Sequence, residues 1–177
     1  MATAIGYKLF RQKNGKLYPL YVLANEETPM NVWLDAKSGP RTDRGKVKSK
    51  LGELAYRPGW HINDGLPYVN HIYTIHNGQK YLKDGCVWCE VEYRTDRSYE
   101  EEARLAGFKN GRFSAVRAQL PYIPKNGYYR YKTSPQMDGA WIIAGEIKVN
   151  RILSDAEVEE ICKANGYEVL RRWQKGA

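Results

Sequence analysis

The sequence has few cysteines, no N-glycosylation sequon and no long apolar run. Its 177 residues contain three cysteines, an odd number, and no Asn-x-Ser/Thr triplet. Both features favour a reducing cytoplasm over a compartment in which disulfides form. No apolar stretch approaches the roughly 20 residues that a membrane span needs, and the first residues lack the apolar core of a signal peptide. We therefore expect a cytoplasmic protein without a membrane partner.

The composition is that of an ordinary globular protein with an excess of positive charge. Hydrophobic residues make up 42% and charged residues 27%, which argues against disorder. No repeat, low-complexity tract or linker is visible, so we expect one domain over residues 1–177. Lys and Arg number 28 against 20 Asp and Glu, a formal net charge of +8. That excess favours a polyanionic partner such as nucleic acid.

Glycine-containing pairs divide the chain into short segments. Asn-Gly occurs five times and Asp-Gly three times, and such pairs tolerate the positive φ of tight hairpin turns. Residues 7–12 and 17–23 alternate on either side of Asn14-Gly15, which predicts a hairpin with an edge strand at Pro19. Further strands are expected at 86–94, 127–133 and 140–149.

Two helices are indicated by capping boxes, in which a serine and the glutamate three residues later satisfy each other's backbone N–H groups. The boxes begin at Ser98 and Ser154, and the helices are expected to end near Gly107 and Asn165. A weaker third helix is expected at 44–54. Together these elements predict an α+β fold, a compact domain with a mainly antiparallel or mixed sheet and two or three helices.

Cys86-Val87-Trp88-Cys89 is a CxxC motif without the features that would make it functional. A metal site needs a second ligand pair, and a redox motif needs a helix N-terminus that lowers the thiol pKa. On a strand, the two sulfurs point to opposite faces. We therefore expect ordinary half-buried cysteines, with Cys162 in the apolar stripe of the last helix.

Residues 39–50 form the most basic segment. It resembles a P-loop superficially, but five residues separate its glycines and Val47 stands where a hydroxyl would hold Mg²⁺, so we do not expect an NTPase. Two interpretations remain: a solvated basic loop, or a surface that contacts a phosphate backbone together with cations elsewhere. The nucleic-acid-binding candidates are Arg41, Arg44, Lys46, Lys48, Lys50, Arg130 and Lys132.

Residues 56–67, followed by His71 and His76, combine histidine, tryptophan and arginine between Pro and Gly corners. A shaped loop of this kind can present a general acid–base to solvent. The alternative is a structural loop in which Trp60 fills the core and His61 bonds to backbone. The candidates in the loop are Arg57, Trp60, His61, Asp64 and His71. Their spacings match no common ligand set, so we expect no metal site.

Glu90 and Glu92 lie on one face of the following predicted strand. A histidine, a carboxylate and a nearby cation would suit metal-free RNA cleavage or attack on a nicotinamide glycoside. If the protein is an enzyme, the catalytic candidates are therefore His61 and Glu92.

Three stretches, residues 7–20, 56–67 and 141–155, resemble an uncharacterised domain of phage and mobile-element proteins. That domain is sometimes embedded in large polyvalent proteins delivered with DNA. The resemblance covers most of the chain and implies a bacterial cytoplasm. It also implies a role in host takeover, DNA establishment or counter-defence, without an established chemistry.

A second resemblance, to ADP-ribosyltransferases, rests on the aromatic residues and Arg11 of the first strand and on Glu90-x-Glu92. It implies that Arg11 binds a phosphate of NAD and that Glu92 stabilises the oxocarbenium-like transition state. The Ser-Thr-Ser element of that family is not visible, and the two glutamates fall within a strand instead of a loop.

The leading hypothesis from the sequence is a non-enzymatic phage or mobile-element accessory protein that needs no cofactor. It would bind nucleic acid or a nucleic-acid-handling complex, for example as an anti-CRISPR-like inhibitor of a host defence nuclease. The alternatives are an ADP-ribosyltransferase-like enzyme that uses NAD, a metal-free ribonuclease, and a purely structural module.

Overall fold

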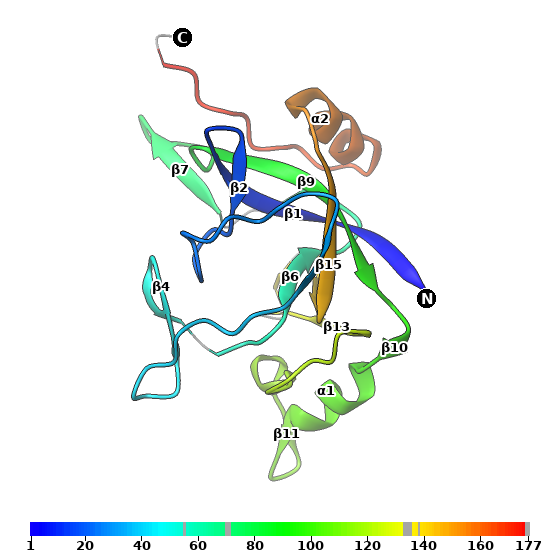
Figure 1. Ribbon diagram of the computed structural model, residues 1–177. Helices are drawn as coiled ribbons and strands as arrows, with labels where there is room; N and C mark the ends of the chain where they lie inside the picture. Colours follow the sequence, from blue (N-terminus) through cyan, green and yellow to red (C-terminus); the bar gives the residue numbers. More distant parts are fainter. Residues whose placement is uncertain (55, 70–71, 133–135, 138, 176–177) are drawn as a thin grey trace.

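The fold is mostly sheet. The computed structural model describes residues 1–54, 56–69, 72–132, 136–137 and 139–175 (Figure 1). About 40% of the residues lie in strands and about 12% in helices. The predicted α+β class is therefore wrong, and the protein is β-rich, because the helices add only short segments to a large sheet.

The main sheet has nine strands. They are β1 (Thr3–Lys13), β2 (Lys16–Tyr18), β3 (Trp33–Asp35), β6 (Trp60–Asn63), β9 (Cys86–Arg94), β10 (Arg97–Ser98), β13 (Gly127–Tyr131), β14 (Trp141–Ala144) and β15 (Glu146–Ile152). Their order is β10-β13-β14-β6-β1-β9-β15-β3, with β2 paired to β1. Strands β10 and β13 are parallel, and the other pairs are antiparallel. The long β1–β9 ladder forms the centre, and the predicted strand at 86–94 is confirmed as β9.

The sheet curls on itself at Gly145. Strands β14 and β15 are joined through this one residue, yet three strands separate them in the sheet order. The two strands must therefore meet at a corner. A Cβ at Gly145 would lie 2.0 Å from the carbonyl oxygen of Pro124, so a side chain does not fit there. The predicted single strand at 140–149 is accordingly two strands.

Each side of the curled sheet carries its own apolar cluster. The cluster enclosed by the strands includes Phe10, Ile62 and Val91, all fully buried. The cluster on the other side includes Trp88 and is covered by the two helices and the C-terminal segment. Figure 1 shows the last helix and the C-terminal segment lying beside β1 and β9. Two cores of this kind explain why the first half of β9 is buried on both faces, with Cys86 and Trp88 on one side and Cys89 on the other.

Three small hairpins project from this framework. They are β4–β5 (Val47–Ser49 and Gly52–Leu54), β7–β8 (Tyr73–His76 and Gln79–Leu82) and β11–β12 (Phe108–Lys109 and Arg112–Phe113). The helix predicted at 44–54 is therefore wrong. Val47 is buried and pairs with Leu54, whereas the lysines on either side are exposed, and Gly52 makes the turn with φ +93°.

The Asn-Gly pairs act as predicted at several turns. Asn14, Asn77 and Asn110 have φ near +50°, and the glycine after each also has positive φ. Each pair closes a two-residue turn, in β1–β2, β7–β8 and β11–β12 respectively. This is the geometry that favours Asn-Gly in hairpins.

The described residues contain two α-helices, α1 (Glu100–Ala106) and α2 (Asp155–Ala164), and a 3₁₀ turn at Ala115–Arg117. The hydroxyl of Ser154 accepts a 3.1 Å bond from the Glu157 N–H, as the capping pattern predicts. At α1 the pattern fails, because Tyr99 occupies the capping position and provides no side-chain bond. Among the described helices, neither is long and apolar enough to cross a membrane.

Candidate functional site

The segment predicted to be an exposed loop enters the main sheet instead. Residues 60–63 form β6, between β14 and β1, and His61 pairs with Ile143. Gly59 precedes the strand with φ +118°, and a Cβ there would lie 2.4 Å from a methyl carbon of Ile143. The chain can enter the sheet at this angle only because residue 59 has no side chain.

His61 is held in a neutral form. Its Nδ1 lies 3.3 Å from the carbonyl oxygen of Gly59, and its ring lies edge-on to Trp141 with the centroids 6.0 Å apart. Burial, with the charge of Lys8 as the next cause, lowers the pKa of His61 to about 3. An imidazole with this pKa carries almost no proton at neutral pH and cannot serve there as a general acid.

Glu92 does not join His61. It lies on β9 opposite Ile5, and it accepts bonds from Asn150 at 3.0 Å and from Lys148 at 3.3 Å. Although burial raises the pKa of Glu92, the bonds from Asn150 and Lys148 outweigh this and lower it overall. The carboxylate is therefore neutralised on the sheet surface, and it does not line the cavity that His61 lines.

Arg11 lies too far along the sheet to share a dinucleotide site with Glu92. It pairs with Cys86 at one end of β9, whereas Glu92 lies six residues further along that strand. Six strand residues span about 20 Å. The guanidinium donates to the carbonyl oxygen of Ala24 and stacks near the ring of Tyr18, 5.4 Å from its centroid.

A cavity of about 630 Å³ opens where the edge of β1 changes partner. Strand β1 pairs with β6 at Tyr7 and with β2 from Arg11 onward. In the residues that the structure describes, the stretch between these pairings has only β9 as a neighbouring strand. The open side is lined by residues 19–29, 34–39 and 56–61 and by the β4–β5 hairpin. We call this the β1 cavity.

Lys8 is the central charged residue of the β1 cavity. It lies opposite Cys89, on the side of the sheet that carries Phe10, and its Nζ donates a 2.8 Å bond to the carbonyl oxygen of His61. The ammonium lies 5.6 and 5.8 Å from the ring centroids of Phe10 and Trp60. Burial lowers the pKa of Lys8 to about 8. Sequence reasoning missed this residue, although its alternation with Phe10 indicated that it shares a buried face.

Arg57 is the second cation on the cavity lining. Its Cζ lies 5.3 Å from the ring centroid of Tyr131, and its Nε is buried without a hydrogen-bond partner. No carboxylate of the described chain lies within 4.0 Å of either Arg57 or Lys8. Both cations lower the pKa of His61, and all three residues line the β1 cavity.

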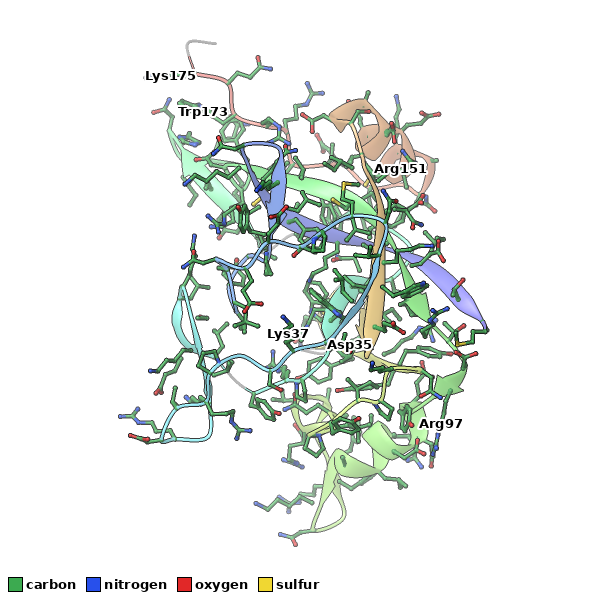
Figure 2. All side chains as sticks on the ribbon, in the orientation of Figure 1. Asp35, Lys37, Arg97, Arg151, Trp173 and Lys175 are labelled. Carbon is green, nitrogen blue, oxygen red and sulfur yellow. The ribbon has the colours of Figure 1, made fainter. Side chains whose placement is uncertain are left out.

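Each of the three carboxylates on the lining pairs with a lysine other than Lys8, and one of these lysines, Lys37, also lines the cavity. Glu26 pairs with Lys37 at 3.4 Å, Glu27 with Lys16 at 3.5 Å, and Asp35 with Lys125 at 2.9 Å. Asp35 and Lys37 lie on one extended segment in Figure 2. The lining carries as many carboxylates as cations, but among the described residues no carboxylate pairs with Lys8 or Arg57.

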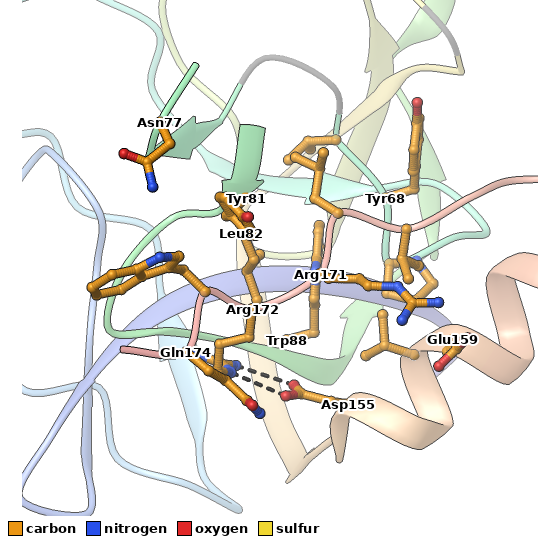
Figure 3. Close-up of a pocket in the computed structure, with 16 residues that line it drawn as sticks. Tyr68, Asn77, Tyr81, Leu82, Trp88, Asp155, Glu159, Arg171, Arg172 and Gln174 are labelled. Carbon is orange, nitrogen blue, oxygen red and sulfur yellow. Dashed lines mark hydrogen bonds and ion pairs between the residues drawn. The ribbon is translucent and has the colours of Figure 1, made fainter. Parts of the chain in front are cut away.

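A second cavity, of about 410 Å³, lies between α2, the β7–β8 hairpin and the C-terminal segment. Its charged lining residues are Asp155, Glu159, Arg171 and Arg172, and Figure 3 shows Arg172 bound to Asp155 through two bonds of 3.0 and 3.1 Å. Arg172 also donates to the carbonyl oxygen of Cys86 at 2.9 Å. This cation is fully engaged within the fold, in contrast to Lys8 and Arg57.

The basic hairpin, defined as residues 41–50, is the most positive part of the surface. Its five cations are exposed, and the segment contains one acidic residue, Asp43. None of the five lies within 4.0 Å of a carboxylate of the described residues. The guanidinium of Arg41 lies 3.7 Å from the ring centroid of Tyr56 and donates to the carbonyl oxygen of Gly45.

Arg130, a predicted nucleic-acid contact, differs from the cations of the basic hairpin because two carboxylates bind it. Arg130 binds Asp64 at 2.9 Å and Glu100 at 2.7 Å, and these bonds raise its pKa. Asp64 is therefore an ion-pair partner on the surface and does not line the β1 cavity. Lys132 is exposed after β13, and no described contact connects it to the basic hairpin. His71 lies outside the described residues.

The cysteines are buried thiols on opposite faces, as the strand spacing predicts. Cys86 belongs to the cluster under α2 and Cys89 to the cluster enclosed by the strands. Burial raises their pKa values to about 11 and about 12. Within the described ranges, no group of three or more His, Cys, Asp or Glu residues is arranged to hold a metal ion.

Comparisons with known proteins assign no family. No family model matches the sequence, and no solved structure matches it. Cytokinin dehydrogenase 5 of Oryza sativa subsp. japonica is 28% identical over 106 residues, which cover 60% of this chain. The chain spans only 18% of the length of that protein. A similarity that covers so little of the dehydrogenase assigns neither a fold nor an activity to this chain.

Proposed function

We propose that the chain binds the phosphate backbone of nucleic acid through the basic hairpin. The observation that carries the proposal is the set of five exposed cations, Arg41, Arg44, Lys46, Lys48 and Lys50, without a carboxylate partner among the described residues. Cations that stay in water and unpaired can exchange their counterions for phosphates, and the release of counterions drives such binding.

The spacing of the lysines supports this interpretation. Lys46, Lys48 and Lys50 are exposed, and they alternate with the buried Val47 and half-buried Ser49. Alternate residues of a strand lie about 6.7 Å apart on one face. The three lysines therefore form a row at and beside β4, with spacing that allows each to contact a different phosphate, and such contacts carry no sequence information.

The test is the salt dependence of binding to a labelled 20-nucleotide oligomer, as DNA and as RNA, measured by fluorescence anisotropy. With five phosphate contacts on a single-stranded oligomer, the affinity should fall about 130-fold between 50 and 200 mM salt. The triple variant Lys46→Gln, Lys48→Gln, Lys50→Gln should retain only about a ten-fold fall.

The matched control is Lys13→Gln, Lys80→Gln, Lys175→Gln, which removes the same charge from exposed positions elsewhere. It should keep the steep salt dependence of the unaltered protein. Binding that does not respond to salt, or equal losses in the two triple variants, would contradict the proposal.

The resemblance to phage and mobile-element domains supports a setting of DNA establishment or counter-defence within a bacterial cytoplasm. In that setting the partner is either free nucleic acid or a nucleic-acid-handling complex such as a host defence nuclease. Pull-down from a bacterial lysate with and without nuclease treatment separates the two. Capture abolished by nuclease supports the proposal, whereas capture that survives nuclease and is equal in both triple variants contradicts it.

A further inference from the structure

The β1 cavity contains two cations whose charge the described protein does not neutralise. Lys8 and Arg57 both line it, and their recorded contacts are one carbonyl oxygen, that of His61, and aromatic rings. An ammonium has three N–H donors, and with the described residues Lys8 uses one of them, while the Nε of Arg57 has no partner among these residues. Lys8 and Arg57 are both half-buried, and cations that are partly removed from water and unpaired are costly unless a ligand supplies the missing charge.

The remaining wall of the cavity is mainly apolar. Leu9, Leu34, Val69, Ile72 and Trp141 line it, and Leu9 and Val69 are buried core residues. A volume of about 630 Å³ lies within the range of sites that hold small organic ligands. The three lining carboxylates are bound to lysines and do not compete for Lys8 or Arg57.

The contrast with the second cavity strengthens the inference. There Arg172 is bound by Asp155 and by a backbone carbonyl, so the fold itself supplies the anion. In the β1 cavity the described residues supply one oxygen to Lys8, the carbonyl oxygen of His61. The difference indicates which of the two cavities has room for an external negative charge.

We propose that the β1 cavity binds an amphipathic oxyanion, a carboxylate or phosphate head group on an apolar body, with the head group at Lys8 and Arg57. The apolar body lies against Leu9, Leu34 and Ile72. A guanidinium and an ammonium both donate to oxyanions, and charge-assisted bonds of this type are the strong ones. The two cations of this site lie outside the basic hairpin, which contributes Val47 to the cavity wall, and the proposal does not depend on the function proposed for that hairpin.

The test is isothermal titration calorimetry with decanoate, decyl phosphate and decanol at concentrations below micelle formation. The two acids should bind, with their relative affinities showing which head group is preferred, and decanol should bind at least about ten-fold more weakly. Lys8→Met should weaken the binding of the acids about ten-fold or more and leave that of decanol within about two-fold. Arg57→Met should act in the same direction.

The control is Lys13→Met, an exposed lysine on the same strand, which should bind all three probes as the unaltered protein does. Should Arg57→Met fail to fold, Lys8→Met alone decides, because it replaces a charged side chain by an apolar one of similar length. Equal affinity for decanol and the acids, failure of both acids to bind, or unchanged acid binding by Lys8→Met would each overturn the proposal.

Discussion

The basic hairpin and the β1 cavity both carry unpaired cations, but they hold them in opposite surroundings. In the basic hairpin the side chains extend into water from a two-stranded turn whose only buried anchor among residues 41–50 is Val47. In the β1 cavity Lys8 lies on the central strand among aromatic rings. Water stabilises the first set of charges at no cost to the fold, whereas the second set is maintained against desolvation. Charge alone therefore does not identify a site, and its environment decides which ligand it can take.

The largest expected effect is on the wall of the β1 cavity. Gly59→Ala should lower the free energy of unfolding by about 3 kcal/mol, because it combines positive φ with a Cβ 2.4 Å from Ile143. Urea denaturation measures the change. Gly65→Ala is the control, since Gly65 also has positive φ but has nothing within 4 Å, and it should lose about 1 kcal/mol. Equal losses would show that the cavity wall is not tightly packed.

Substitution of the buried cation should have the next largest effect, with the opposite sign. Lys8→Met should raise the free energy of unfolding at pH 7 by about 2 kcal/mol, because desolvation lowers the pKa of Lys8 to about 8 and the charged form is disfavoured in the folded state. Lys13→Met, which changes an exposed lysine of the same strand, should stay within about 0.5 kcal/mol of the unaltered protein.

The pH dependence of the Lys8→Met effect has a defined sign. Between about pH 8 and the ordinary lysine pKa the unfolded chain binds more protons than the folded one, so Lys8 costs progressively less stability as the pH rises. The gain from Lys8→Met should therefore shrink across this window. His61 and Cys89 face Lys8, and their shifted pKa values of about 3 and about 12 keep both uncharged there. A gain that is constant between pH 7 and 10.5 would contradict a desolvated Lys8.

Much of the framework could be predicted from local patterns. The alternation at 86–94 indicated β9, the Asn-Gly pairs indicated tight turns, and Ser154 indicated the start of α2. The fold class could not, because most strands have four residues or fewer and acquire their pairing from distant segments. The curl at Gly145 depends on its contact with Pro124, which no local pattern shows.

Of the two candidate sites, one could be predicted from the sequence and the other could not. The basic hairpin was visible as a run of cations, because exposure of charged side chains needs no partner. The β1 cavity was not, since it forms where three separate segments leave one edge of β1 uncovered. The sequence suggested that His61 and Glu92 form a catalytic pair. The register of β6 and β9 against β1 places them apart.

Arg130 differs from the cations of both sites, because it is a surface cation that two carboxylates of the protein neutralise. Arg130→Gln should cost about 1 kcal/mol in the free energy of unfolding, because it breaks half-exposed ion pairs with Asp64 and Glu100. It should leave the affinity for nucleic acid unchanged in the anisotropy assay. Arg44→Gln, which removes an unpaired cation of the basic hairpin, should do the reverse. A loss of nucleic-acid affinity in Arg130→Gln would return this residue to the binding surface.

The smallest expected effect on stability is at the basic hairpin itself. The triple variant Lys46→Gln, Lys48→Gln, Lys50→Gln should unfold within about 0.5 kcal/mol of the unaltered protein in urea, since these side chains are exposed and form no ion pair among the described residues. A larger loss would mean that the lysines support the fold, and the change in nucleic-acid binding would then have a structural cause.

Amide chemical-shift mapping by NMR tests the central claim most directly, because it locates both ligands on one protein. A short oligonucleotide should shift the amide signals of residues 41–50 and leave those of Lys8 and residues 57–61 in place. Decanoate should shift the signals of Lys8 and residues 57–61 and leave those of residues 42–45 in place, because Val47 is the member of residues 41–50 that lines the β1 cavity. Shifts of Lys8 and residues 57–61 by the oligonucleotide, shifts of residues 42–45 by decanoate, or oligonucleotide shifts spread evenly over all exposed cations would contradict the assignment of the two ligands to two regions.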